Sequence, residues 1–427
     1  MKNQKSLLIG QFSDAFSPIL DGVSLTVKNY AEELTKNGCY VYVVTPSFPG
    51  HQDFERFSVI RYFSVPIPVR KPYRAGIPEL DFKILKKIRN IPFSLVHVHS
   101  PFSAAKLGLY SAKQSNCPII ATFHSKYKDD LIRAIPNEAI VRHILKKIVL
   151  FFASVDEVWV PQTGAGEVLS QYGYKGKTVV VPNGTDLGNI SDLSLFRQNT
   201  PLRLNSGKKK ILLYVGQLIL EKNLLFLIES LRHIKYPDYA LWIIGEGYAK
   251  KDLELLISTY HLEQKVFFKG PVKDRKTLEE ICASGDLLLF PSLYDNAPLV
   301  VREAASVGTP SLLLVGSTAA EIIQEKRNGF LSAYSPESYA EKIDFILHND
   351  SLRQSVGFHA AQTLAKPWKD IVDEVKNRYI SLIRRKEGSW HYIKERDTSL
   401  RNFSSRSRAI RLTTVRLISN STGRLGS

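Results

Sequence analysis

The sequence predicts two α/β domains in tandem, each built around a parallel β-sheet. In the first half of the chain, short apolar runs alternate with stretches of helical periodicity. The same alternation restarts after a polar, lysine-rich stretch at 204–210 (LNSGKKK). Such alternation is typical of βαβ units, whose strands are parallel. The length of 427 residues fits two domains of ordinary size or more.

The expected strands are the short apolar runs, taken in chain order. In the first half they are SLLIG, YVYVVTP, FSLVHVHS, PIIATFH and DEVWVPQ, with helices over about 25–37 and 104–115. In the second half they are KILLYVG, ALWIIG, KVFFKG, DLLLFPS and TPSLLLV, with a helix over about 223–234 and further helices at the end.

The domain boundaries follow from breaks in this pattern. We expect a first domain over 1–190, a second domain over 205–365, a C-terminal helix over 366–387 and a basic, mostly disordered tail over 388–427. Glycine and proline punctuate a stretch without clear periodicity between Asp186 and Lys210, which predicts a hinge there. A ligand is then expected between the domains, at the carboxyl ends of both sheets.

Charge and composition narrow the class of protein. The chain has 58 Lys and Arg against 41 Asp and Glu, a formal net charge of +17. Residues 1–190 carry 23 basic and 15 acidic side chains, and residues 388–427 carry 8 and 2, which favours an anionic partner such as a membrane surface or nucleic acid. No apolar run is long enough to span a bilayer, and the N-terminus does not resemble a secretory signal, so we expect a cytoplasmic protein.

The three cysteines, Cys39, Cys117 and Cys282, are odd in number and widely spaced. They lack the spacing of a zinc site or of a disulfide framework, so we expect buried structural thiols.

A first candidate for ligand binding follows the strand KILLYV. In GQLILEKN (216–223) a glycine turn leads into a helix whose first turn carries Lys222, so backbone N–H groups and a cation converge as an anion site requires. A plain strand-to-helix connection with a solvated lysine gives the same pattern. The later IIGEGY (243–248) lacks the third glycine of the dinucleotide-binding fingerprint and indicates a tight turn.

A second candidate is a pair of acids. Asp295 and Glu303 lie eight residues apart in LYDNAPLVVREAAS, flanking a turn and the start of a helix. Two acids at this interval can bind two ends of one polar ligand, although such a pair is common by chance.

These two motifs resemble those of the retaining glycosyltransferases with the GT-B architecture, in particular the large group 4 family that uses nucleotide-diphosphate sugars. The resemblance implies two Rossmann-like domains facing across a cleft, with a C-terminal helix returning to the first domain. In the family, a Gly-Arg-x-x-x-x-Lys turn holds the diphosphate, and a Glu-x7-Glu motif binds the sugar and the nucleotide ribose.

Most of the donor-binding residues carried over by motif position lie in the second half of the chain, and one, Gly22, lies in the first. The resemblance implies that Lys222 contacts phosphate, Asp295 the sugar and Glu303 the ribose. It extends to the donor-binding positions Gly216, Gln217, Leu299 and Val300.

The sequence departs from the family pattern at three positions. Gln217 stands where the family usually has Arg, Asp295 replaces the first Glu, and Pro298 replaces a Gly. Each change removes charge, reach or a hydrogen-bond donor, since glutamine carries no charge and proline has no amide hydrogen.

Further candidates lie in the first half. Gly22, in a loop that leads into a helix, resembles the family's acceptor-side loop near the donor phosphate, although a simple turn fits equally. His124 ends PIIATFH, where the family has a histidine that contacts the donor sugar near the reacting carbon. His97 and His99 alternate along one strand, so they share a face and either line the same cleft or are structural. Asp186 in PNGTD either faces the cleft or supports a turn.

The implied chemistry needs no resident cofactor. No D-x-D motif occurs, so no metal ion is expected, and the nucleotide-diphosphate sugar is a co-substrate. No covalent nucleophile is evident, so the family mechanism of front-face attack with retained configuration is expected.

Two basic segments suggest the acceptor. Residues 81–91 place Ile84, Ile88 and Ile91 on one face among lysines, and residues 139–153 repeat the pattern. Such helices bind anionic lipid surfaces, or else pack on the sheet with a solvated lysine face. The first half also resembles family members that glucosylate diacylglycerol.

Three hypotheses result. The first is a peripheral membrane enzyme that moves glucose from UDP-glucose to diacylglycerol or a lipid-linked acceptor. The second is a capsular or exopolysaccharide glycosyltransferase of the same fold. The third, from another class, is a non-catalytic binder of sugar nucleotides or nucleic acid, although nucleic acid is the less favoured partner because few aromatic residues accompany the basic ones in the tail.

Overall fold

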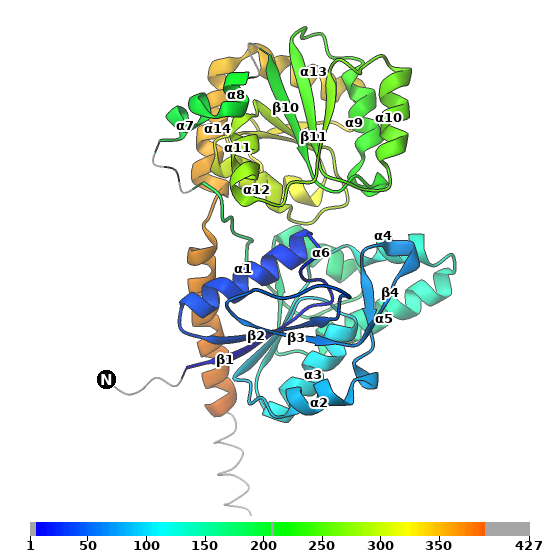
Figure 1. The fold of residues 1–427 in the computed structure, drawn as a ribbon, viewed down its shortest axis with the longest axis vertical. Coiled ribbons are helices and arrows are strands. Elements are labelled where there is room, and N and C mark those ends of the chain that lie inside the picture. Colours follow the sequence, from blue (N-terminus) through cyan, green and yellow to red (C-terminus); the bar gives the residue numbers. More distant parts are fainter. Residues whose placement is uncertain (1–5, 189, 191, 206–208, 389–427) are drawn as a thin grey trace, which may run out of the picture. The chain divides into compact units, whose positions relative to one another are not determined.

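Two parallel β-sheets dominate the chain (Figure 1). The computed structural model describes residues 6–188, 190, 192–205 and 209–388. The first sheet has seven strands in the order β3-β2-β1-β6-β7-β8-β9, and the second has six in the order β12-β11-β10-β13-β14-β15. All pairs within both sheets are parallel. The predicted fold class, two α/β units with parallel sheets, is therefore confirmed.

The first sheet and its helices occupy the part of the chain up to residue 180. Its strands are β1 (Leu8–Phe12), β2 (Tyr40–Pro46), β3 (Ser58–Tyr62), β6 (Leu95–Val98), β7 (Ile119–Thr122), β8 (Glu157–Val160) and β9 (Thr178–Val180). Its helices are α1 (Gly22–Lys36), α2 (Phe82–Arg89), α3 (Ser103–Ser115), α4 (Tyr127–Ala134), α5 (Glu138–Ala153) and α6 (Thr163–Gln171). A separate antiparallel hairpin joins β4 (Ser64–Pro66) to β5 (Arg74–Gly76), with 3-10 turns at Pro68–Arg70 and Pro78–Leu80.

The second sheet follows two short helices, α7 (Leu193–Asn199) and α8 (Pro201–Asn205). Its strands are β10 (Lys210–Val215), β11 (Tyr239–Ile244), β12 (Val266–Gly270), β13 (Leu287–Phe290), β14 (Ser311–Leu314) and β15 (Phe330–Ser332). Its helices are α9 (Leu224–Leu231), α10 (Lys250–Thr259), α11 (Arg275–Ser284), α12 (Leu299–Ser306), α13 (Pro336–His348) and α14 (Asp350–Leu364), with 3-10 turns η3 (Leu220–Lys222) and η4 (Thr318–Ile322).

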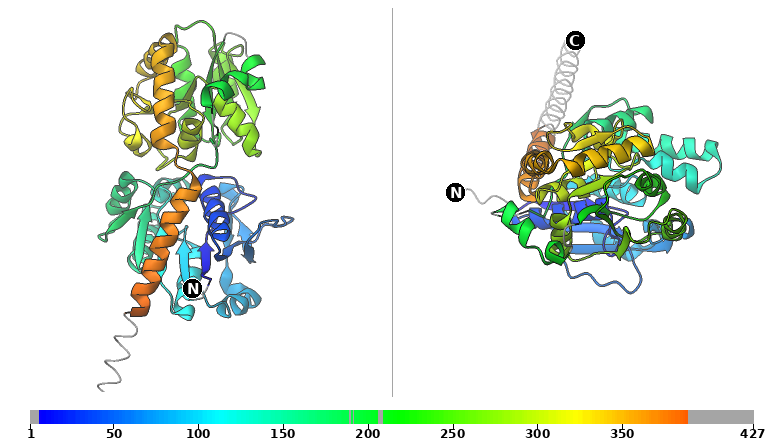
Figure 2. Two further views of the ribbon diagram at one scale, coloured as in Figure 1. Left: turned by 90° about the vertical axis from the view of Figure 1, so that its left-hand side faces the viewer. Right: turned by 90° about the horizontal axis from the view of Figure 1, so that it is seen from above.

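Burial on both faces explains why the strands of the second sheet read as continuous apolar runs. Along β10, Leu212 and Tyr214 pack into a core cluster with α9, α10 and α13. The alternate residues Ile211 and Leu213 pack into another cluster with α11, α12 and α14. A strand with helices on both sides needs apolar side chains at every position. Figures 1 and 2 show the helices on the two sides of each sheet.

Several elements differ from the sequence prediction. The edge strands β3, β9 and β15 and the β4–β5 hairpin were not expected, because short edge strands give little periodic signal. The stretch expected to lack regular structure between Asp186 and Lys210 contains α7 and α8. The cysteines are buried free thiols, as the spacing predicted.

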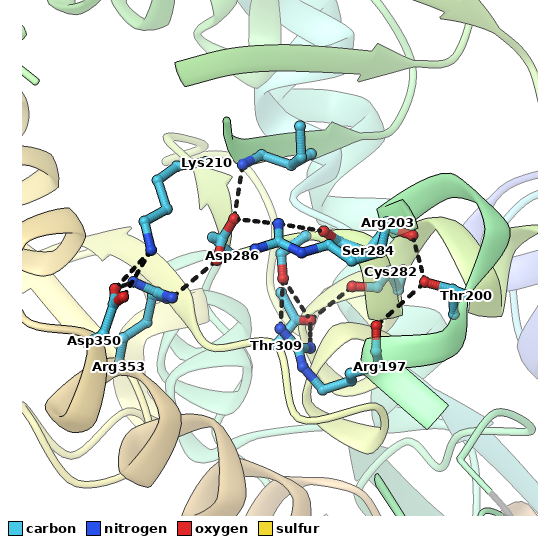
Figure 3. Close-up of polar contacts among 12 residues, drawn as sticks. Arg197, Thr200, Arg203, Lys210, Cys282, Ser284, Asp286, Thr309, Asp350 and Arg353 are labelled. Carbon is cyan, nitrogen blue, oxygen red and sulfur yellow. Dashed lines mark hydrogen bonds and ion pairs between the residues drawn. The ribbon is translucent and has the colours of Figure 1, made fainter. Parts of the chain in front are cut away.

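Charged contacts fix α7 and α8 to the second half of the chain (Figure 3). Arg197 of α7 donates to the carbonyls of Val307 (3.0 Å) and Gly285 (2.7 Å). Arg203 of α8 pairs with Asp286 at 2.8 Å. Asp286 is only 2% exposed, and it also pairs with Arg353 at 2.9 Å. A buried carboxylate with two guanidinium partners therefore joins α8 to α14.

The chain returns to the first half after α14. Residues 368–376 are helical, and the Trp368 ring contacts the ring of Tyr30 in α1 edge-on at 5.8 Å. The side chains of Asn37 and Asp373 form a hydrogen bond of 2.7 Å. These contacts match the expected return of a C-terminal helix to the first domain. Residues 377–388 belong to a second unit and are helical, and the basic tail after Gly388 lies outside the described residues.

The two basic segments form helices, but the apolar face of the first is covered. Ile88 of α2 is buried in the first core, and Ile84 and Ile91 pack against it. The isoleucine stripe is therefore not free to enter a lipid surface. The exposed apolar residues beside the lysines are instead Leu80 and Phe82. Within the described part of the chain, the structure has no helix of the length and apolarity that a bilayer crossing requires.

We predict that Asp286→Asn destabilises the protein by about 3 kcal/mol or more, because the buried Arg353 and the partly exposed Arg203 both lose a buried charged partner. Denaturant unfolding followed by circular dichroism measures this change. Asp350→Asn is the matched control, since Asp350 also pairs with Arg353 but is 55% exposed in its side chain. We expect a loss below about 1 kcal/mol for the control. Equal losses in the two variants would contradict the role assigned to the buried pair.

Candidate active site

The strand order of each sheet marks where a ligand is expected. Order reverses between β1 and β6 in the first sheet and between β10 and β13 in the second. In open parallel sheets, ligands bind beyond the carboxyl ends of strands at such reversal points. The segments that follow these four strands carry most of the residues considered below.

Glycines behind the turn after β10 hold it in place. A Cβ atom on Gly245 would lie 1.9 Å from the carbonyl oxygen of Gly216, and one on Gly247 would lie 2.2 Å from that of Leu218. The Leu218 N–H also donates to the Glu246 carbonyl at 2.9 Å. The Gly-x-Gly of IIGEGY therefore gives the turn 216–218 room to approach, which explains this motif without a dinucleotide.

Lys222 and Asp295 meet in the structure. Lys222 ends the turn η3, and its Nζ lies 2.5 Å from Oδ1 of Asp295 in the segment after β13. Asn223 fixes this arrangement, because its side-chain amide donates to the Pro291 carbonyl at 3.2 Å. The two predicted motifs therefore form one site, with a cation and an acid in direct contact.

Two acceptor atoms beside this pair have no partner. Asp295 Oδ2 and Asn296 Oδ1 are both buried and make no hydrogen bond, although Asn296 donates to the His124 carbonyl at 3.0 Å. Buried polar atoms normally have partners, and an orphaned acceptor is costly. Adjacent orphaned acceptors are suited to a ligand that brings several hydroxyl donors.

Glu303 has a partner that the sequence did not indicate. It lies in α12, is 5% exposed, and its Oε1 is 2.6 Å from Nη2 of Arg275 at the start of α11. Burial raises the pKa of the Glu303 carboxyl, and Arg275 opposes that rise. Nε of Arg275 also donates to Asp186 at 2.8 Å. Asp186 therefore supports Arg275.

The start of α12 offers free backbone donors. Pro298 is the residue before the first turn and has no N–H group. Leu299 and Val300 are the first two helical residues, and their N–H groups lack partners within the helix. The predicted donor-binding positions Leu299 and Val300 therefore lie at an anion-favouring helix start.

A chain of hydrogen bonds orients His124. His99 Nε2 donates to Gln11 Oε1 at 2.6 Å, so in neutral His99 the other nitrogen, Nδ1, accepts from His124 Nε2 at 3.0 Å. This arrangement leaves Nδ1 of His124 as an acceptor. Burial lowers the pKa of His124 to about 4 and that of His99 well below its usual range, so both rings are neutral near pH 7.

His97 does not line the cleft that the sequence suggested. Its side chain is fully buried, and its Nε2 shares a hydrogen bond of 2.7 Å with Thr122 of the neighbouring strand β7. Period-two alternation correctly placed it beside His99, with ring centroids 4.1 Å apart. It acts as a packing residue behind His99.

Gly22 begins α1 and is exposed. Asp21 caps this helix, since its side chain accepts from the Ser24 N–H at 2.7 Å. A Cβ atom on Gly22 would meet nothing within 4 Å, so no close contact in the structure requires glycine here. Nearby, the Tyr73 hydroxyl of the hairpin donates to Asp21 at 2.8 Å.

Other residues of the site carried no sequence signal. Lys126 donates to the Leu293 carbonyl at 2.8 Å, and Tyr294 donates to Asp130 at 2.8 Å. Both contacts join positions more than 160 residues apart, as the separations of 167 and 164 residues show. Only the packing of the two halves brings them together.

Comparison with known proteins identifies both halves. Residues 20–189 match the model of Glycosyltransferase Family 4, and residues 197–363 match that of Glycosyl transferases group 1. The chain is 25% identical over 332 residues to alpha-monoglucosyldiacylglycerol synthase of Streptococcus pneumoniae, covering 76% of this chain and 74% of that protein.

Solved structures share the fold. Sucrose-phosphate synthase from Thermosynechococcus elongatus aligns with a TM-score of 0.72 at 20% identity, covering 89% of this chain and all of that one. Anabaena HepE in complex with UDP-glucose aligns with a TM-score of 0.68 at 18% identity, covering 88% of this chain and 99% of that one.

We predict that the free energy of unfolding falls as the pH drops from about 6.5 to about 4. In the unfolded chain histidines bind protons near pH 6.5. The folded-state pKa values of His97, His99 and His124 are lowered, so the unfolded state binds more protons in this window. Denaturant unfolding across pH 4.5–7.5 measures the slope. His99→Gln should flatten it, whereas the exposed His359→Gln should not, and equal slopes in all three proteins would refute the assignment.

Proposed function

Because the chain is a glycosyltransferase with the GT-B fold, we propose that it transfers a hexose with retained configuration to a membrane lipid. The donor is glucose from UDP-glucose, and the acceptor is diacylglycerol or a lipid-linked saccharide. The reaction needs no metal ion. The observation that carries the proposal is the contact of Lys222 with Asp295 beside two buried acceptors without partners.

The chemistry of these groups fits a sugar donor. A hexose brings several hydroxyl donors, which satisfy Asp295 Oδ2 and Asn296 Oδ1. Lys222 and the N–H groups of Leu299 and Val300 then neutralise the diphosphate. Glu303 accepts from the ribose hydroxyls once it exchanges part of its contact with Arg275.

The transfer step breaks the bond between the sugar C1 and the phosphate oxygen, and it forms a bond from C1 to the acceptor oxygen. Attack is on the face that the phosphate leaves, and the acceptor proton passes to the departing phosphate oxygen. His124 stays neutral, since its pKa of about 4 lies far below neutrality. Its Nδ1 accepts a hydroxyl hydrogen of the sugar and so orients the ring.

The lipid acceptor is supported by the synthase relative and by surface charge. That relative is named for the synthesis of a glucosyl lipid. Lys86 and Lys87 of α2 are exposed next to Phe82, and Lys146 and Lys147 of α5 are also exposed. Basic side chains beside exposed aromatic residues favour an anionic bilayer surface.

The decisive test is transfer of radiolabel from UDP-glucose to lipid. Purified protein is incubated with anionic liposomes and diacylglycerol in EDTA, and the organic phase is counted. We expect label in the lipid, and Asp295→Ala should lower kcat/KM by about a hundredfold or more. Asp252→Ala, on the exposed surface of α10, is the control and should keep the wild-type rate.

Other outcomes would point elsewhere. Nucleotide release without lipid label would favour the polysaccharide alternative, and nucleotide binding without turnover would favour a non-catalytic binder. A β-linked product would contradict retention, and activity that requires added Mg²⁺ would contradict metal independence.

We also predict that Lys86→Glu with Lys87→Glu weakens binding to anionic vesicles by about tenfold or more, because each basic residue near such a surface contributes about 1 kcal/mol. Vesicle co-sedimentation measures the affinity. The matched control is Lys250→Glu with Lys251→Glu, which reverses the charge of another adjacent exposed pair, on α10. An equal loss in the control would show a general charge effect and no docking face.

A further inference from the structure

Tyr294 connects the candidate donor site to the first half of the chain. It directly precedes Asp295, and its ring centroid lies 5.7 Å from Nζ of Lys222. Its hydroxyl donates to Oδ2 of Asp130 in α4 at 2.8 Å. Arg70, in the hairpin, lies 2.7 Å from the same carboxylate oxygen. One side chain therefore contacts Lys222 with its ring and a first-half ion pair with its hydroxyl.

The segment that carries Tyr294 depends on such contacts for its position. Residues 291–298 form no helix or strand between β13 and α12. Besides Tyr294, the first half holds this segment through Lys126 at the Leu293 carbonyl and through Asn296 at the His124 carbonyl. Asp295 lies between these contacts in the sequence. The position of its carboxylate therefore depends on where the contacts hold the segment.

The hairpin reaches the other side of the donor site as well. Tyr73, three residues after Arg70, donates to Asp21, and the side chain of Gln217 lies beside its hydroxyl. The loop 67–73 therefore contacts the turn after β10 through Tyr73 and the segment after β13 through Arg70 and Asp130. Lys222 and Asp295 come from these two segments.

We propose that Tyr294 is a positioning residue which, through Asp130 and Arg70, makes the geometry of the Lys222–Asp295 pair depend on the first-half hairpin and α4. This inference rests on the proposed function. The hydrogen bond from Tyr294 to Asp130 is charge-assisted, which makes it stronger and more directional than a neutral one. Without this hydrogen bond, the Tyr294 ring is no longer held against Lys222, and the segment that carries Asp295 loses one of its contacts with the first half. The donor-binding groups themselves remain.

The test is a comparison of Tyr294→Phe, Asp130→Asn and the double variant in the transfer assay. We expect kcat to fall about tenfold in each single variant, with the KM for UDP-glucose changed less than about threefold. The double variant should be no worse than the singles, because both remove the same interaction. Tyr339→Phe is the matched control, since its buried hydroxyl donates to the Leu312 carbonyl at 3.2 Å within the second half.

Hydrogen exchange gives a readout that does not need turnover. In the full-length protein, Tyr294→Phe and Asp130→Asn should speed amide exchange in 127–134 and in 292–297, whereas Tyr339→Phe should leave both segments unchanged. If the wild type transfers no hexose, the proposed function fails, and exchange alone decides the inference. Unchanged exchange in both segments, additive losses in kcat, or an equal loss in Tyr339→Phe would overturn it.

Discussion

The order of the parallel strands reverses once in each sheet, and this reversal determines which segments can meet at the site. Because β1 with β6 and β10 with β13 lie side by side, the segments after these strands emerge at the same edges of their sheets. A lysine and an acid that are 73 residues apart in the sequence thereby come into contact. The buried apolar strands fix the edges, and the irregular segments between strand and helix carry the polar groups. The polar side chains of the site are thus positioned by the rigid, apolar sheets.

The sequence was informative where local pattern determines structure. Apolar runs gave the central strands of both sheets, because a strand covered on two faces admits few polar residues. The alternation of residues along the strand predicts that His97 and His99 share one face of the sheet. It does not predict which of the two side chains lies at the carboxyl edge of the sheet. Contacts set by packing stayed hidden. Arg275 pairs with Glu303 across 28 residues only because α11 lies beside α12, and no motif precedes it.

Each of the three residues that depart from the family pattern has a defined place in the structure. The side chain of Gln217 lies beside the Tyr73 hydroxyl, which brings the turn next to the hairpin. The shorter Asp295 meets Lys222 directly at 2.5 Å. Pro298 precedes α12, and the N–H groups of the next two residues have no partners within the helix. The altered residues therefore belong to an ordered polar site.

The attachment of α7 and α8 to the second half affects where the chain can be divided into two fragments. Arg197 and Arg203 tie residues 193–205 to Gly285, Asp286 and Val307, at the start of β13 and the end of α12 (Figure 3). A recombinant second half that began at residue 205 would lose both arginines and leave Asp286 with fewer counterions. A cut before Asp192 would keep them. Separate expression of the halves, and any split-protein reporter built from them, should therefore divide the chain near residue 190.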